Sequence, residues 1–240
     1  AKAINSNREF IHAHPEYKPD LSQYLKFRYY LFLYDNNFSL ASIFKEKEFY
    51  GLKFYVNKNV LIPRPETELL VDESLRIIRK QANQDVFLID VGTGSGCIPI
   101  SIIKTIYAED KELARKLEKS NCCIDISEKA LKVAQRNAAK HKISLNLTKG
   151  YLLSPLINKK IFKNDNYNFI ITANLPYLTN TQYRQEKSIS REPKKALVAK
   201  DEGLELYKKM FKQIKNRQKY YRTKNLTILI EIDPSQEKKI

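Results

Sequence analysis

Residues 86–96 read Val-Phe-Leu-Ile-Asp-Val-Gly-Thr-Gly-Ser-Gly, and this stretch decides the fold class. Its first part is a short apolar run typical of a central parallel strand. Three of the chain's 6 glycines then alternate over residues 92–96, and the apolar segment 97–103 that follows predicts a buried helix. A strand, a glycine turn and a helix in succession indicate a nucleotide-binding unit, because glycine lets the backbone approach a ligand closely at the carboxyl edge of a sheet.

The spacing of the glycines narrows the kind of ligand. The loop reads Gly-x-Gly-x-Gly, which differs from the dinucleotide pattern and from a phosphate-binding loop that ends in Gly-Lys-Ser/Thr. A tight turn without a ligand is the simpler interpretation, but it does not explain why half of the glycines gather here. We therefore expect a cofactor site at this loop, formed by Asp90, Gly92, Thr93, Gly94 and Gly96.

The next apolar run ends in an acid. Residues 122–127 read Cys-Cys-Ile-Asp-Ile-Ser and predict a strand with Asp125 at its end, where a carboxylate can accept hydrogen bonds from both hydroxyls of a ribose. Ser127 also fits the N-cap of a helix over 128–141, and the two roles are compatible. The segment 107–120 before this strand is rich in Lys and Glu and predicts a solvated helical extension.

A third apolar run delivers an asparagine to its carboxyl end. Residues 170–177 read Ile-Ile-Thr-Ala-Asn-Leu-Pro-Tyr. Asn174 offers a side-chain carbonyl, Leu175 offers a backbone carbonyl, and Pro176 stiffens the loop that follows. Two converging acceptors suit an NH2 group on a planar system, such as a carboxamide or the exocyclic amine of a base.

Together these segments resemble the class I S-adenosylmethionine-dependent methyltransferases, and more specifically the HemK/PrmC family of protein-glutamine N-methyltransferases. The resemblance covers residues 41–240, and the run Pro-Arg-Pro-Glu-Thr-Glu at 63–68 is nearly diagnostic of that family. Supporting matches are residues 48–51, 134–138, 192–193, 196–197 and 203–207.

The resemblance implies a Rossmann-like, doubly wound α/β sheet and methylation of the side-chain amide of the Gln in the Gly-Gly-Gln loop of peptide chain release factors. It implies that the catalytic residues are Asn174, Leu175, Pro176 and Tyr177. It implies that S-adenosylmethionine contacts Asp90, Gly92, Thr93, Gly94, Gly96, Asp125, Ile126, Tyr151 and Asn174. The substrate pocket is then lined by Arg64, Pro65, Glu66 and Thr67.

Two positions depart from the family pattern. The family usually has Asn-Pro-Pro-Tyr where this chain has Leu175, and we expect the chemistry to survive because the acceptor there is a backbone carbonyl. The family also usually has an acid after the third strand of the sheet. This chain has Gly150 and Tyr151 instead, which leaves open whether Tyr151 replaces the usual acid as the contact of the adenine of the cofactor.

The chain is expected to have three parts. Residues 1–45 carry helical patterns, notably over 21–34, and the resemblance implies a short or truncated segment that helps to hold the protein substrate. Residues 46–62 predict a β-hairpin linker that turns at 57–59. The methyltransferase domain follows over 63–240 and begins with a helix over 66–82. Its strands are expected near 86–91, 121–126, 144–148, 167–174 and 226–232. A polar insert over 178–201 is expected to cover the substrate, and the last strands of the fold are expected to be missing.

Composition excludes several classes of protein. No apolar run approaches the length of a membrane span, and no secretory signal precedes the fold. The 3 cysteines and 3 scattered histidines predict neither a disulfide framework nor a metal site, which agrees with a reducing cytoplasm. Tyrosines 24, 29, 30 and 34 follow helical spacing and are expected in a core or an interface.

The net charge of +16 is a weak pointer to contact with the ribosome or RNA, and solvation alone also explains it. We expect a monomer. Two alternatives to glutamine methylation stay open. Asn-Leu-Pro-Tyr is also the form found in ribosomal RNA adenine dimethyltransferases, although residues 48–51 and 63–68 match the other family. The chain could also be a non-catalytic module that retains the fold and the cofactor.

Overall fold

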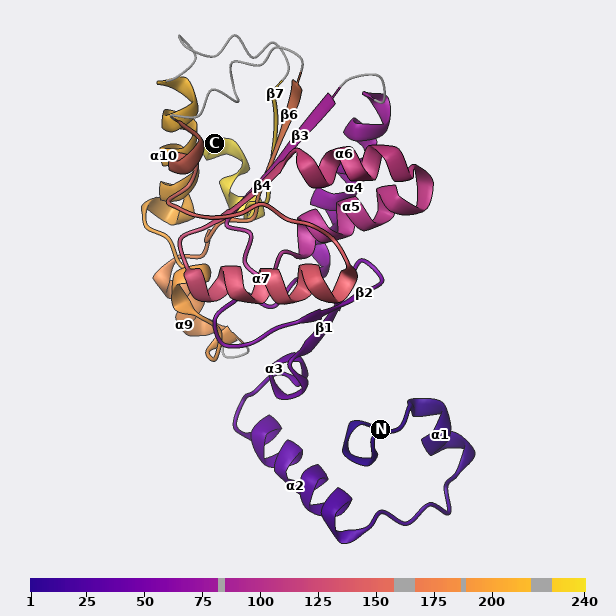
Figure 1. Ribbon diagram of the computed structural model, residues 1–240. Coiled ribbons are helices and arrows are strands. Elements are labelled where there is room, and N and C mark those ends of the chain that lie inside the picture. Colours follow the sequence, from indigo (N-terminus) through magenta and orange to yellow (C-terminus); the bar gives the residue numbers. More distant parts are fainter. Residues whose placement is uncertain (82–84, 158–166, 187–188, 217–225) are drawn as a thin grey trace.

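The centre of the molecule is a parallel sheet with the strand order β5-β4-β3-β6-β7 (Figure 1). This computed structural model describes residues 1–81, 85–157, 167–186, 189–216 and 226–240. The strands are β3 (Asp85–Val91), β4 (Asn121–Asp125), β5 (Leu147–Lys149), β6 (Tyr167–Ala173) and β7 (Leu226–Ile230). The strand order reverses beside β3, which makes the doubly wound arrangement predicted from the sequence and leaves a crevice at the carboxyl ends of the strands.

Side chains of the central strand alternate between two hydrophobic cores. Val86 and Leu88 of β3 pack into one core, whereas Phe87, Ile89 and Val91 pack into the other. Because both faces are covered, most of the strand must be apolar, which explains the hydrophobic run over 86–89 in the sequence.

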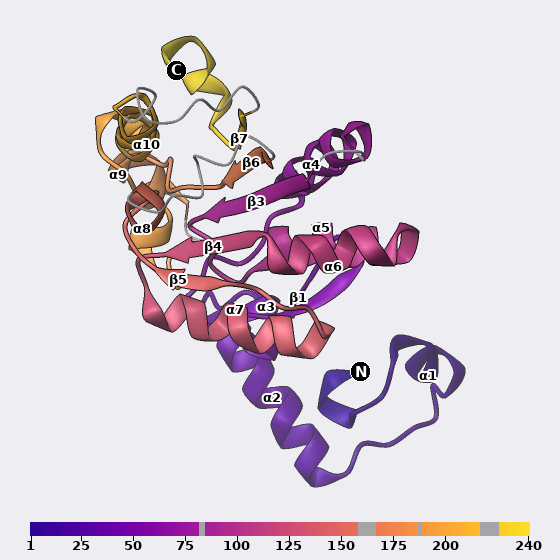
Figure 2. The same cartoon turned by 45° about the horizontal axis from the view of Figure 1, so that its top comes forward.

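Helices cover both faces of the sheet, as Figure 2 shows for α5 and α6 on one side and α8 and α10 on the other. The first face carries α4 (Glu68–Lys80), α5 (Cys97–Glu109), α6 (Lys111–Lys119) and α7 (Glu128–His141). The second carries α8 (Ser154–Ile157) and α10 (Glu205–Lys215), with α9 (Asn180–Gln185) beyond them. Short 3-10 turns lie at Lys2–Ile4, Pro65–Thr67, Lys194–Ala196, Asp201–Gly203 and Pro234–Lys239.

The predicted solvated extension at 107–120 is wrong in part. A break at Asp110 separates α6 from α5, because the Asp110 carboxylate accepts from the backbone N–H groups of Glu112 and Leu113 and starts a new helix. Ala114 and Leu117 of α6 are buried in the first core. The predicted helix over 128–141 is confirmed. Residue 82 of the predicted helix over 66–82 lies outside the described residues, as do residues 187–188 of the insert.

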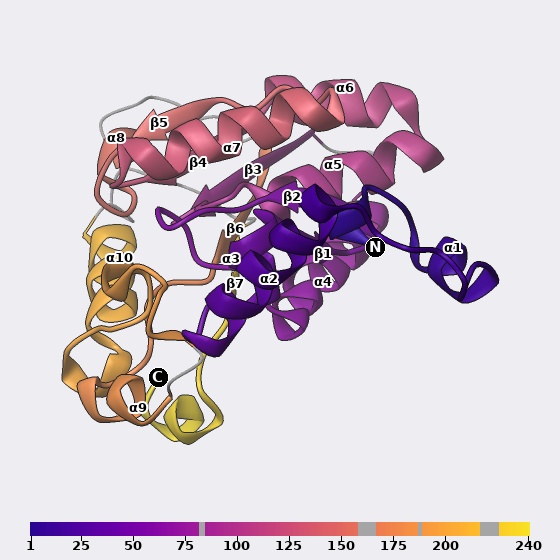
Figure 3. The same cartoon turned by 90° about the horizontal axis from the view of Figure 1, so that it is seen from below.

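The N-terminal part consists of α1 (Arg8–Ala13), α2 (Leu21–Asp35) and α3 (Leu40–Phe44), and α3 contacts β1 of the following hairpin (Figure 3). No residue of α2 is buried. Tyr24, Tyr29 and Tyr34 are each at least half exposed, so these three do not lie in a core of this chain, and an interface stays the prediction for them. The described residues contain no helix long and apolar enough to cross a bilayer.

The hairpin turns earlier than predicted. Its strands are β1 (Glu46–Phe49) and β2 (Leu52–Tyr55), joined by Tyr50 and Gly51 rather than by residues 57–59. Both turn residues have positive φ, 50° and 68°, as a two-residue hairpin of this hand requires. Residues 57–59 instead form a separate turn in which the Asn57 side chain accepts from the backbone N–H of Asn59 (2.9 Å).

Candidate active site

A cavity of about 580 Å³ lies at the carboxyl ends of β3, β4 and β6. Its described lining includes residues 91–95, 124–127, 150–152, 174–176 and 193–196. This volume is within the range of about 300–1,000 Å³ typical of small-molecule sites. A larger open depression of about 780 Å³ beside β5 and α7 has no carboxylate in its described lining, and it lies away from the glycine loop.

The glycine loop is held close to both the cavity and the asparagine strand. Gly92 has a φ of 74°, and a Cβ added there would lie 3.0 Å from Cδ2 of Leu175. The backbone N–H groups of Gly92 and Thr93 donate to the carbonyl of Ile124 (2.8 and 3.0 Å). A side chain at position 92 would therefore collide with the loop that carries Asn174, which accounts for glycine at that position.

Asp125 lines the cavity and joins the glycine loop to helix α7. Its carboxylate accepts from the backbone N–H of Gly94 (3.0 Å) and from that of Ser127 (2.8 Å). Ser127 in turn caps α7, since its hydroxyl accepts from the backbone N–H of Ala130 (3.2 Å). Burial raises the pKa of Asp125 above its ordinary value. The acid and the N-cap predicted from the sequence are both present.

Asp90 is the most deeply buried acid of the site. Its side chain is 1% exposed. Oδ1 accepts from the hydroxyl of Thr172 (2.7 Å), whereas Oδ2 has no hydrogen-bond partner among the described residues. Burial raises the pKa of Asp90 to about 6. Asp90 is not part of the described lining of the cavity, so its predicted contact with the cofactor stays a prediction.

The amide of Asn174 is held by two side chains from other parts of the fold. Its Nδ2 donates to Oγ1 of Thr67 (2.9 Å) and to Oε2 of Glu231 (2.8 Å). Both hydrogens of the NH2 group are thereby used. No hydrogen bond from the described residues reaches Oδ1. That carbonyl is thus the group that Asn174 has left to offer a ligand in the cavity.

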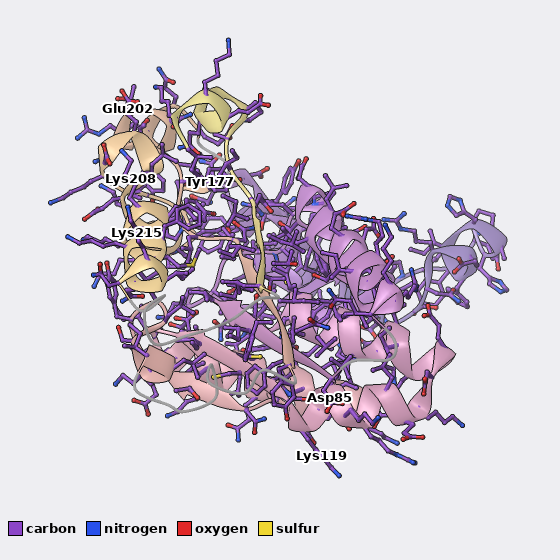
Figure 4. The ribbon with its side chains drawn as sticks, turned by 90° about the horizontal axis from the view of Figure 1, so that it is seen from above. Asp85, Lys119, Tyr177, Glu202, Lys208 and Lys215 are labelled. Carbon is purple, nitrogen blue, oxygen red and sulfur yellow. The ribbon has the colours of Figure 1, made fainter. Side chains whose placement is uncertain are left out.

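Tyr177 follows on the same loop and contacts the same carboxylate. Its hydroxyl donates to Oε1 of Glu231 (3.0 Å), and burial, with Glu231 nearby, raises its pKa. Figure 4 shows Tyr177 near α10 and the C-terminal segment, far from Asp85 at the start of β3. The neutral phenol is therefore fixed at the carboxyl end of the sheet.

Tyr207 supports the backbone of Leu175 from below. The buried Tyr207 hydroxyl accepts from the backbone N–H of Leu175 (3.0 Å) and donates to the backbone carbonyl of Glu231. The carbonyl of Leu175 lies 3.5 Å from this hydroxyl, at the limit of a hydrogen bond, and so stays available to another donor. Gly203 packs directly behind the loop, because a Cβ there would lie 1.9 Å from the carbonyl oxygen of Tyr177.

We expect Tyr207→Phe to lower the free energy of unfolding by about 1–3 kcal/mol, because the buried N–H of Leu175 loses its partner. Urea unfolding followed by circular dichroism measures this change. Tyr24→Phe, at an exposed position of α2, is the matched control and should leave the midpoint unchanged. Equal stability of the two variants would show that the Tyr207 hydroxyl does not support the loop.

The four residues predicted to line a substrate pocket separate in the structure. Thr67 lines the cavity and holds Asn174, as described above. Arg64 points instead to Glu192, with 2.5 Å between the guanidinium and Oε1, and the other oxygen of Glu192 accepts from the backbone N–H of Ile62 (2.9 Å). Pro65 and Glu66 are exposed and are not part of the described lining.

Of the remaining predicted cofactor residues, Ile126 and Tyr151 line the cavity, whereas Gly96 is not part of its described lining. Ile126 is 65% exposed. Tyr151 lines the cavity at the end of β5, with the ammonium of Lys209 6.0 Å from its ring centre. Gly96, at the start of α5, has a φ of 76° and packs against Ala134 of α7.

The sequence interpretation missed Glu231, Tyr207 and Glu192, although residues 192 and 207 lie in segments that it singled out. No group of three or more His, Cys, Asp or Glu side chains arranged for a metal occurs in the part of the chain that the structure describes.

Comparison with known proteins agrees with this geometry. A family model described as a methyltransferase domain matches residues 82–239. The release factor glutamine methyltransferase of Dictyoglomus turgidum is 33% identical over 237 residues, which cover 98% of this chain and 76% of that protein. The protein of the same name from Mycoplasma mycoides subsp. mycoides is 34% identical over 231 residues, covering 95% of this chain and 75% of its own length.

Proposed function

Because the chain belongs to the release factor glutamine methyltransferases, we propose that it methylates the side-chain amide nitrogen of a glutamine in a peptide chain release factor. One observation carries the proposal furthest. The carbonyl of Asn174 and the backbone carbonyl of Leu175 are adjacent, and neither is used up by a close hydrogen bond within the fold. A primary amide has two N–H donors to match them.

The residues that line the cavity support S-adenosylmethionine as the cofactor. We assign the ribose hydroxyls to Asp125, the cationic methionine part to the side of the site near Asp90, and the adenine to the rim between Ile126 and Tyr151. The unused Oδ2 of Asp90 and the absence of a side chain at Gly92 support this assignment. When bound, this cofactor supplies an electrophilic methyl group on a positively charged sulfur.

The protein's task is mainly alignment. An amide nitrogen is a poor nucleophile because its lone pair is delocalised into its own carbonyl. Asn174 and Leu175 would each accept one amide hydrogen, which turns the remaining face of the nitrogen toward the methyl group and stabilises the positive charge that develops on nitrogen. No general base is needed before transfer, since the proton can leave to water afterwards. Pro176 and Tyr177 would form the walls of the slot.

We expect Asp125→Asn to weaken the affinity for S-adenosylmethionine at least about tenfold. Each charge-assisted bond to a ribose hydroxyl contributes about 1.5–3 kcal/mol, and an amide can accept at only one of its two ends. Titration calorimetry measures the dissociation constant, with Glu128→Gln, at an exposed position of α7, as the control of equal charge change. Unchanged affinity in a folded variant would remove Asp125 from the cofactor site.

Mass spectrometry tests the substrate. A release factor incubated with the protein and S-adenosylmethionine should gain one methyl group, on the Gln of its Gly-Gly-Gln loop, which is slim enough to enter the slot. A release factor carrying Glu in place of that Gln should gain none, because a carboxylate has no NH2 group to hold. Methylation of adenine in ribosomal RNA, with none on the release factor, would overturn the proposal in favour of an RNA substrate.

Further properties follow as predictions. We propose that the protein acts as a monomer in the cytoplasm. Contact with the ribosome or RNA through its basic surface would be weak and steeply dependent on salt.

A further inference from the structure

The carboxylate of Glu231 lies behind the candidate slot and contacts two of its residues. Glu231 follows β7 directly, and its backbone N–H donates to the carbonyl of Ala173 (3.1 Å), which places it beside the end of β6. One carboxylate oxygen accepts from Asn174 and the other from Tyr177, at 2.8 and 3.0 Å. A single side chain thus joins the predicted acceptor to the predicted wall of the slot.

The amide of an asparagine can sit in two orientations of nearly equal shape, which exchange its oxygen and its NH2 group. Only one of them presents Oδ1 to a substrate. Thr67 is compatible with both, because a hydroxyl can donate or accept. An ionised carboxylate can only accept, so Glu231 favours the orientation that turns the NH2 group of Asn174 toward it.

We infer that Glu231 is a positioning residue that fixes the amide orientation of Asn174 and so keeps Oδ1 facing the substrate slot. The inference rests on the proposed function, in which Oδ1 accepts a hydrogen from the substrate amide. Glu231 itself contacts no reacting atom. Its effect on the reaction passes through Asn174 and, by the same carboxylate, through the position of Tyr177.

Replacing Glu231 by glutamine keeps the shape of the side chain and reverses the orientation that the Asn174 amide prefers. The Gln carbonyl can accept from the hydroxyl of Tyr177, which leaves the Gln NH2 group facing Asn174. Asn174 then satisfies this donor by turning Oδ1 toward it, and its own NH2 group turns to the slot. There it opposes the NH2 group of the substrate, because two donors cannot pair.

We therefore expect Glu231→Gln to lower kcat on a release factor about tenfold or more, with the dissociation constant of S-adenosylmethionine unchanged. Glu237→Gln, an exposed carboxylate in the same C-terminal segment, makes the same charge change and should keep the wild-type kcat. Loss of cofactor affinity in parallel with kcat, or a normal kcat for Glu231→Gln, would overturn the inference.

A double-mutant cycle separates positioning from general support. If Glu231 acts through the amide of Asn174, then adding Glu231→Gln to Asn174→Ala should change kcat less than about twofold, because the group to be oriented is already gone. If both substitutions lower kcat by independent factors that multiply, Glu231 does not act through Asn174 and the inference is wrong.

Nuclear magnetic resonance tests the orientation without any substrate. In the wild-type protein the side-chain NH2 resonances of Asn174, assigned by their loss in Asn174→Ala, should show cross-peaks to Thr67 and slow exchange with water. Both properties should be lost in Glu231→Gln and kept in Glu237→Gln. This result would stand even if no release factor were methylated, so failure of the proposed function can be told apart from failure of the inference. Identical Asn174 resonances in the wild-type and Glu231→Gln proteins would overturn it.

Discussion

Asn174→Ala should lower kcat on a release factor on the order of a hundredfold or more while leaving the affinity for S-adenosylmethionine near that of the wild type. The alanine removes one of the two acceptors that orient the substrate nitrogen, and the loss of one preorganised transition-state contact has an effect of this size. The fold should survive, because Asn174 itself lines the cavity, where water can replace its amide. Single-turnover methyl transfer from labelled cofactor measures the rate.

Asn216→Ala is the matched control for this experiment. Asn216 is exposed at the end of α10 and lies outside the described lining of the cavity. It should keep the wild-type rate. A normal rate for Asn174→Ala would remove Asn174 from the reaction, and a large loss of cofactor affinity would place it in cofactor binding instead.

Asp90→Asn should stabilise the cofactor-free protein at pH 7 by up to about 3 kcal/mol. The pKa of this buried acid is raised to about 6 in the folded state, against about 3.9 for an unfolded aspartate. Between those two values the folded protein binds more protons than the unfolded one, so stability is greatest below about pH 4 and falls as the pH rises to about 6. Asparagine keeps the acceptor for Thr172 and carries no charge, which removes this loss.

Urea unfolding at a series of pH values measures the effect of Asp90→Asn. The wild-type protein should lose stability from pH 4 to 6 relative to the variant, and the difference should level off above pH 7. If Asp90 lies near the bound cation as proposed, the same variant should bind S-adenosylmethionine at least about tenfold more weakly, since the negative charge is lost. Asp85→Asn, at the exposed start of the same strand, should change neither quantity. Parallel pH profiles for the wild type and Asp90→Asn would contradict this account.

The elements that the sequence predicts well are those with a local physical cause. The strand predicted over 86–91 follows from burial on both faces of β3, and the helix predicted over 128–141 follows from the Ser127 cap. The structure has both within one residue of the predicted bounds. The sequence predicts the hairpin turn at the wrong place, because Tyr50 adopts a positive φ, which is uncommon for a tyrosine. The exposed tyrosines of α2 show that helical spacing of aromatic residues does not by itself indicate what they pack against.

In the candidate site, too, the residues with a local sequence signal could be predicted and those without one could not. Asp125 and Asn174 stand at the ends of predicted strands and could be read from the sequence. Their partners could not, since the bonds from Asn174 reach Thr67 and Glu231 at separations of 107 and 57 residues. Leu175 gives a further example. Its backbone N–H donates to Tyr207, a bond that the proline usual in the family could not make.

The dispersion of these partners along the chain has a consequence for biosynthesis. Residues 85–125, with the glycine loop and Asp125, are synthesised before Asn174, and Asn174 is synthesised before Glu231. The asparagine amide acquires its last holder only when Glu231 has emerged and β7 has docked beside β6. Until then a partly synthesised chain lacks the carboxylate that accepts from Asn174, so the order of assembly disfavours premature methylation by a nascent chain.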